Sequence, residues 1–167
     1  YVRDWSQVIL LPDAITALSN FRNTGYKIVL VTNQSAVGRG LISLENVEEI
    51  NNKLAKVIQK NGGHIDAIYM CPHAPEDQCE CRKPRPGLFL QAARELSLDL
   101  GSSWMIGDAW SDLLAGQNAM LRGVILVKTG RGTDQLQQPK PEKLQQYLVT
   151  DDLSGAFDSI NKHGQLF

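Results

Sequence analysis

The sequence predicts an α/β fold: a three-layer, Rossmann-like arrangement in which helices cover both faces of a parallel sheet. Three observations support this prediction. Short apolar runs alternate with amphipathic stretches along the chain, as in βαβ units. The run KIVLV at residues 27–31 is apolar after its first residue and rich in valine and isoleucine, which is typical of a strand buried on both faces. Polar residues follow three such runs directly, where parallel sheets place their chemistry.

Each element has its own local signals. Pro12 suits the first turn of a helix over residues 12–24, and Gly25 can end that helix. Ser43 is a candidate N-cap for a second helix, which we expect to stop at the glycine pair 62–63. Further helices are expected at residues 86–96, 111–120, near 141 and at 153–161, with strands at 67–70, 104–106, 124–127 and 148–149.

Length and composition narrow the class of protein. A chain of 167 residues with 43% hydrophobic residues predicts one domain over residues 1–167. Seventeen basic against 18 acidic side chains give a net charge of −1, which argues against a dedicated binder of nucleic acid or of anionic membranes. Lys27 and Asp108 interrupt the two apolar stretches that come nearest to a membrane span. We expect a cytoplasmic protein, because its cysteines suggest a reducing compartment. We also expect a monomer.

All three cysteines of the chain lie between positions 71 and 81, together with one histidine. The spacing is Cys71-x-His73-x5-Cys79-x-Cys81. Three thiolates and one imidazole make a complete tetrahedral zinc set, and a metal would order a loop that has no large apolar side chain. The alternatives are a disulfide or ordinary small loop residues. The odd number of cysteines and the one-residue gap between Cys79 and Cys81 disfavour a disulfide network.

Three further segments are candidates for handling phosphate. Arg82 and Lys83 follow the last cysteine and can bind a phosphate through forked donors and a point charge, or they form a solvated basic turn. Asp108 and Asp112 follow a predicted strand with i, i+4 spacing, which suits Mg²⁺, although Asp108 can also cap the helix. Thr32 ends the KIVLV run and can offer a hydroxyl to an anion, but threonine is common at strand ends without such a role.

Three motifs, in this order and at these gaps, resemble those of the HAD phosphatase superfamily: VTNQS, CPH…CxC-RKP and GDxxxD. The resemblance is closer to the branch of histidinol-phosphate and D,D-heptose 1,7-bisphosphate phosphatases, and it spans essentially the whole chain. The zinc loop joined to RKP is the specific motif, whereas GDxxxD is common across the superfamily. RKPRPGLFLQAARELSLDL and VKTG are more similar to the heptose enzymes. A histidinol-phosphate phosphatase is the alternative.

The resemblance implies a Mg²⁺-dependent phosphatase that acts on a small phosphorylated sugar, and it implies a role for each matching residue. Thr32 and Lys83 would stabilise the transferring phosphoryl group. Asp108 would bind Mg²⁺, with Asp112 supporting it. Ala109 departs from relatives in which a lysine at that position touches the substrate. The residues implied to contact substrate are Tyr1, Asn33, Gln34, Ser35 and Arg82.

The nucleophile and the general acid/base of the family are two aspartates in a DxDG segment, which supplies the middle strand of the sheet. The printed sequence contains no such segment. Without it, the two neighbouring strands would have unpaired edges. We therefore expect an N-terminally truncated phosphatase whose first central strand is missing and which is inactive as printed. In the intact protein, the resemblance implies an aspartyl-phosphate that water then hydrolyses.

Two function classes compete with a phosphatase. A non-catalytic, zinc-containing α/β binding domain stays open, because the sequence lacks the nucleophile. A nucleotide-binding Rossmann domain is disfavoured, since no GxGxxG motif follows a strand near the start of the chain.

Overall fold

The computed structural model describes residues 2–11 and 13–164, with only the backbone described for residues 163 and 164. The chain divides into two compact units, Tyr1–Arg82 and Lys83–Phe167, and each is described by itself. Tyr1, expected to contact substrate, and Pro12, expected in the first turn of a helix, lie outside the described residues. The single domain over residues 1–167 stays a prediction.

The first unit contains a two-stranded parallel sheet made of β1 (Val29–Asn33) and β2 (Ala67–Cys71). The register places Thr32 beside Met70 and Asn33 beside Cys71, so the two strands end together. The helical elements of this unit are η1 (Trp5–Gln7), α1 (Ala14–Asn23), α2 (Ser35–Gly38), α3 (Leu44–Lys60) and η2 (Pro75–Asp77).

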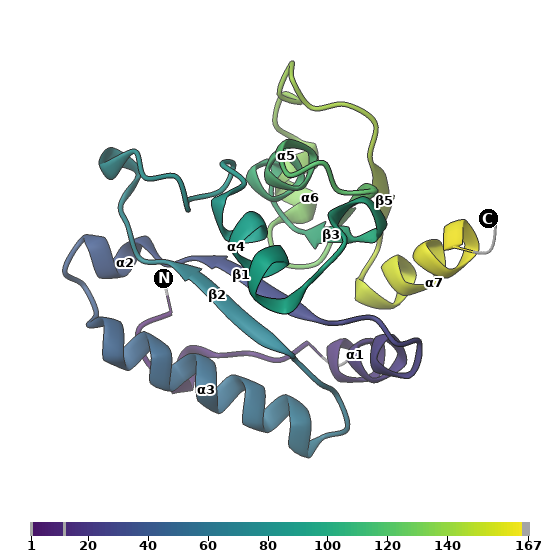
Figure 1. Cartoon of the computed structure of the whole chain (residues 1–167). Helices are drawn as coiled ribbons and strands as arrows, with labels where there is room; N and C mark the ends of the chain where they lie inside the picture. The colour runs from purple at the N-terminus through teal and green to yellow at the C-terminus, as the bar shows by residue number, and fades with distance from the viewer. Residues whose placement is uncertain (1, 12, 165–167) are drawn as a thin grey trace. The chain divides into compact units, whose positions relative to one another are not determined.

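Helix α3 begins and ends where local chemistry requires. The Ser43 side chain accepts a hydrogen bond from the Asn46 N–H at 3.2 Å, which confirms the predicted N-cap. After the helix, Gly62 adopts a φ of +92°, a left-handed conformation that glycine accepts without a steric penalty. The apolar face of α3 packs along the β1–β2 pair (Figure 1), where Val47 lies in a cluster with Met70 of β2.

The second unit contains a three-stranded parallel sheet in the order β3-β4-β5. Its strands are β3 (Trp104–Gly107), β4 (Gly123–Val127) and β5 (Leu148–Thr150). Its helical elements are α4 (Gly87–Leu96), η3 (Leu100–Ser102), α5 (Trp110–Asn118), α6 (Gly132–Leu136) and α7 (Leu153–Gly164).

The central strand β4 is covered on both faces. Val124 and Leu126 belong to a buried cluster with Leu113 of α5. Ile125 and Val127 point to the opposite face, because side chains alternate along a strand, and they are buried as well. This unit therefore confirms the predicted parallel sheet with helices on both faces.

The described strands form two sheets, in keeping with the expectation that the middle strand is missing. Two details differ from the sequence prediction. Strand β1 starts at Val29 instead of Lys27 and runs through Asn33, so Thr32 and Asn33 lie within the strand and not after it. The helix expected near residue 141 is wrong: residues 139–147 are described and contain no helix, since Pro139 and Pro141 each remove a backbone donor.

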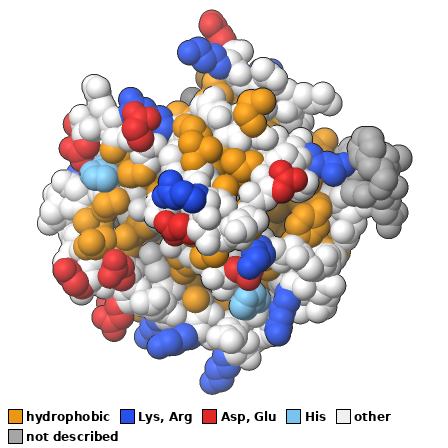
Figure 2. All heavy atoms as spheres, in the orientation of Figure 1, with side chains coloured by type: hydrophobic (Ala, Val, Ile, Leu, Met, Phe, Trp, Pro, Cys, Tyr) orange, Lys and Arg blue, Asp and Glu red, His pale blue; other side chains and the backbone are white. Residues whose placement is uncertain are grey.

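Among the helices of the described chain, none combines the length and the apolar character needed to cross a membrane. Acidic and basic side chains are interspersed on the face of the molecule drawn in Figure 2, in keeping with the net charge of −1.

Candidate functional site

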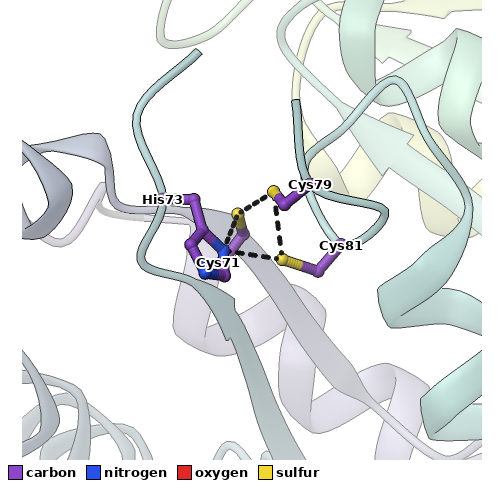
Figure 3. Close-up of side chains that lie close together, drawn as sticks. All are labelled: Cys71, His73, Cys79 and Cys81. Carbon is purple, nitrogen blue, oxygen red and sulfur yellow. Dashed lines mark hydrogen bonds between the residues drawn. The ribbon is translucent and has the colours of Figure 1, made fainter. Parts of the chain in front are cut away.

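The four predicted zinc ligands lie together in the first unit. The Cys71, His73, Cys79 and Cys81 side chains point toward one another (Figure 3), and their ligand atoms all lie within 4.8 Å of each other. All three cysteines are free thiols, so the alternative of a disulfide is not found.

Four of the six distances between these atoms lie within about 0.4 Å of the edges of a zinc tetrahedron. Zn–S bonds of about 2.3 Å and Zn–N bonds of about 2.0–2.1 Å place two sulfurs about 3.8 Å apart, and a sulfur and a nitrogen about 3.6 Å apart. The Cys79 Sγ lies 3.5 Å from the Cys71 Sγ and 3.4 Å from the Cys81 Sγ. The His73 Nδ1 lies 3.7 Å from the Cys71 Sγ and 3.2 Å from the Cys81 Sγ. The donor set therefore fits zinc in both chemistry and size.

The end of β2, a hydrogen bond and an ion pair within the first unit position the metal loop. Cys71 is the last residue of β2 and is fully buried. The carbonyl of His73 accepts a hydrogen bond from the Arg82 Nη1 at 3.2 Å. Farther along the loop, the Arg39 guanidinium pairs with the Glu76 carboxylate at 3.1 Å. Arg82, one of the residues predicted to bind substrate, therefore also anchors the metal loop through this hydrogen bond.

The thiols hold their protons unequally. Burial raises the pKa of Cys71. Burial and the neighbouring thiols raise the pKa of Cys81 still further. Burial acts in the same sense on Cys79, but hydrogen bonds with Cys81 and Cys71 outweigh it and lower the pKa of Cys79. Because a bound metal requires thiolates, binding would release protons from Cys71 and Cys81.

At the end of β1, the structure brings the VTNQS residues beside the metal loop. The Thr32 Oγ1 accepts a hydrogen bond from the Gln34 Nε2 at 3.4 Å, and a hydroxyl that accepts in this way can still donate its proton to an anion. Asn33 and Gln34 are half-buried. Ser35 begins α2 and is only 5% exposed, so its predicted contact with substrate stays a prediction.

In the second unit, Lys83 and Asp112 form a buried ion pair. The Lys83 Nζ lies 2.8 Å from the Asp112 Oδ1, and the two side chains are 9% and 8% exposed. The other carboxylate oxygen, Oδ2, accepts a hydrogen bond from the Ala109 N–H at 3.1 Å. Gly107 makes room for this arrangement, because a Cβ there would lie 2.4 Å from the Asp112 Cβ.

Asp108 follows β3 but does not cap α5, since Asp112 provides the capping carboxylate. The Asp108 Oδ2 accepts a hydrogen bond from the Arg131 N–H at 3.0 Å, and its Oδ1 lies 3.5 Å from the Arg131 Nη2. The carboxylate is 31% exposed at the carboxyl end of the sheet. These features suit a magnesium ligand that stays open to solvent.

Sequence reasoning missed two residues of this arrangement. Arg131 lies 23 positions after Asp108, and no local pattern links them. Gly130 packs against the same carboxylate: its φ is +64°, and a Cβ there would lie 2.4 Å from the Asp108 Oδ2. The glycine of the VKTG segment was the only signal that pointed to this contact.

Named relatives match most of the chain. A D-glycero-beta-D-manno-heptose-1,7-bisphosphate 7-phosphatase from Pseudomonas aeruginosa is 34% identical over 160 residues, which cover 96% of this chain and 88% of that protein. The chain belongs to the HAD phosphatase family. A family model described as HAD-hydrolase-like also matches residues 80–156 of this HAD phosphatase.

Two further comparisons agree with this family. The enzyme of the same name from Pasteurella multocida is 39% identical over 137 residues, covering 78% of this HAD phosphatase and 74% of the relative. A crystal structure of D,D-heptose 1,7-bisphosphate phosphatase from B. bronchiseptica, complexed with magnesium and phosphate, superposes with a TM-score of 0.87. It is 34% identical, and the match covers 98% of this chain and 89% of that one.

Proposed function

We propose that this HAD phosphatase hydrolyses D-glycero-D-manno-heptose 1,7-bisphosphate at the 7-phosphate in a Mg²⁺-dependent reaction. The observation that carries the proposal is the 34% identity over 96% of the chain to a relative of that name. The buried Lys83–Asp112 pair and the open Asp108 carboxylate support it, because phosphoryl transfer depends on positioned charge.

Each phosphate-handling residue has a distinct part in this proposal. Thr32 donates its hydroxyl proton to a phosphoryl oxygen, and Lys83 neutralises the charge that develops there. Asp108 holds Mg²⁺, which when bound supplies positive charge that polarises the phosphoryl group. Asp112 supports the site through Lys83, since its two carboxylate oxygens are engaged by the Lys83 Nζ and the Ala109 N–H.

We further propose that Cys71, His73, Cys79 and Cys81 hold a structural zinc ion. Four protein ligands close a tetrahedral site and leave no position for substrate, so this metal orders the loop rather than taking part in hydrolysis. The contact between Arg82 and the His73 carbonyl places the guanidinium at the edge of that loop. Arg82, Asn33, Gln34, Ser35 and Tyr1 are proposed to line the path of the sugar.

The partner is proposed to be a small phosphorylated sugar, bound by a monomer in the cytoplasm. Three free thiols in one metal-binding loop suit a reducing compartment. Sedimentation at micromolar concentration measures the oligomeric state, and a stable dimer would contradict this part of the proposal.

The experiment that tests the reaction compares two proteins. One is the 167-residue chain, and the other, called the extended enzyme below, carries a DxDG segment of the family ahead of its first residue. We expect the extended enzyme to release phosphate from the heptose bisphosphate only with Mg²⁺, and the 167-residue chain to release none above background. Turnover by the 167-residue chain would mean that another residue is the nucleophile. An inactive extended enzyme that still binds zinc would favour the non-catalytic binding domain.

A further inference from the structure

The short helix α2 lies against the backbone of the metal loop. The Gly38 N–H donates a hydrogen bond to the Pro72 carbonyl at 2.8 Å. Directly before α2, the Gln34 N–H donates a hydrogen bond to the Cys71 carbonyl, also at 2.8 Å. Two backbone bonds therefore join the segment that carries the VTNQS residues to the segment that carries two of the four zinc ligands.

The contact at Gly38 leaves no room for a side chain. A Cβ at this position would lie 2.5 Å from the Ala74 nitrogen and 3.0 Å from both the His73 carbonyl carbon and the Pro72 oxygen. These are backbone atoms, which cannot swing aside as the end of a flexible side chain can. Gly38 is not among the residues with positive φ, so the requirement for glycine at this position is one of space and not of conformation.

We propose that Gly38 is a positioning residue that seats the zinc loop on the segment from Gln34 to Gly38, which follows β1 directly, so that zinc binding and the order of this segment are coupled. The inference rests on the proposed zinc site. To relieve the contact of an added Cβ with Ala74, the loop must move by about 0.5 Å or more. Zinc sites tolerate about 0.2 Å in their ligand distances, and His73 lies between the displaced residues. A side chain added at Gly38 therefore weakens zinc binding, although Gly38 is not itself a zinc ligand.

The first test measures zinc release. Zinc-loaded wild type, Gly38→Ala and Gly40→Ala are mixed with the chromogenic chelator 4-(2-pyridylazo)resorcinol, and the rate of Zn²⁺ transfer is followed by absorbance. Gly40, two residues after Gly38, is the control for strain without crowding: its φ of +66° disfavours alanine, but an added Cβ there would meet nothing within 4 Å. Losing support around a metal site typically costs about 10–100-fold in affinity, so we expect Gly38→Ala to release zinc faster by a factor in this range. Gly40→Ala is expected to release it at the wild-type rate.

The second test uses the wild-type protein alone, so that it does not depend on how a variant folds. Amide hydrogen exchange is measured with and without bound zinc. We expect zinc removal to speed exchange at Gln34 and Gly38 by about tenfold or more, because opening of the loop frees both amides. The Gly63 amide, which donates to the Ile58 carbonyl at 3.0 Å and does not touch the loop, is expected to keep its rate.

The outcomes separate this inference from the proposed zinc site. If the wild type binds zinc but Gly38→Ala releases it as slowly as Gly40→Ala, the seating role of Gly38 is wrong and the zinc site stands. If exchange at Gln34 and Gly38 is the same with and without zinc, the coupling to this segment is wrong. If the wild type binds no zinc, both proposals fall.

Discussion

Removing the charge of Asp112 is expected to destabilise the protein strongly, because it breaks the buried ion pair between this carboxylate and the Lys83 ammonium. At an N–O separation of 2.8 Å, the gross attraction is about 6 kcal/mol for an effective dielectric constant of about 20. Desolvation of both groups offsets much of this attraction, but breaking one partner of a buried pair typically costs about 3–5 kcal/mol. Asp112→Asn keeps an acceptor for the Ala109 N–H, so the change isolates the ion pair.

The free energy of unfolding is measured by urea titration and by thermal melting. A loss of about 3–5 kcal/mol lowers the melting temperature of a protein of this size by roughly 6–20 °C. Asp151→Asn is the matched control, since Asp151 pairs with Lys128 at 2.7 Å while both side chains are largely solvent-exposed. That variant is expected to melt within error of the wild type.

A double-mutant cycle completes the test. Lys83→Met combined with Asp112→Asn removes both charges, and we expect the pair to be less destabilised than the sum of the single variants by about 1–3 kcal/mol. If Asp112→Asn melts like Asp151→Asn, or if the two changes simply add, the buried pair does not hold Lys83 in place and the reasoning is refuted.

Two further predictions concern the metals. Because the pKa values of Cys71 and Cys81 are raised, zinc binding near neutrality displaces a proton from each thiol, so each pH unit should raise the apparent zinc affinity of the wild type at least about 100-fold, roughly tenfold per released proton, as measured by competition with a chelator of known affinity. A pH-independent affinity would show instead that the Cys71 and Cys81 thiols carry no protons near neutrality. In the extended enzyme, Arg131→Ala should lower the Mg²⁺ concentration that gives half-maximal activity by up to about fivefold, since an exposed ion pair is worth about 1 kcal/mol or less. Arg131→Lys, which keeps the charge near Asp108, serves as the control, and a raised Mg²⁺ requirement in Arg131→Ala would show that Arg131 assists the metal.

Local signals in the sequence were sufficient for most of the fold. Ser43 is an N-cap in the structure because a serine side chain can reach the N–H of a first-turn residue, and this depends only on neighbours in the chain. The zinc set was recognisable for the same reason: its four ligands lie within eleven residues, and their chemistry is complete. Helix α2 escaped prediction, because four residues are too short to show a periodic pattern.

What sequence reasoning could not supply are contacts between distant segments. Lys83 and Asp112 were both candidates, but nothing in their spacing of 29 residues indicates that they pair with one another. Arg131 and Gly38 matter only through the backbone or carboxylate that folding brings beside them. The helix expected near residue 141 failed because two prolines outweighed the weak signal for a helix there.

The central claim is tested most directly by the ratio of kcat/KM for two substrates in one preparation of the extended enzyme. D-glycero-D-manno-heptose 1,7-bisphosphate and histidinol phosphate are assayed side by side with Mg²⁺, and again after the metal is chelated. We predict a clear preference for the heptose bisphosphate, with activity on both substrates lost on chelation and restored by added Mg²⁺. A preference for histidinol phosphate would contradict the proposed substrate, and hydrolysis that survives chelation would contradict the proposed role of Asp108.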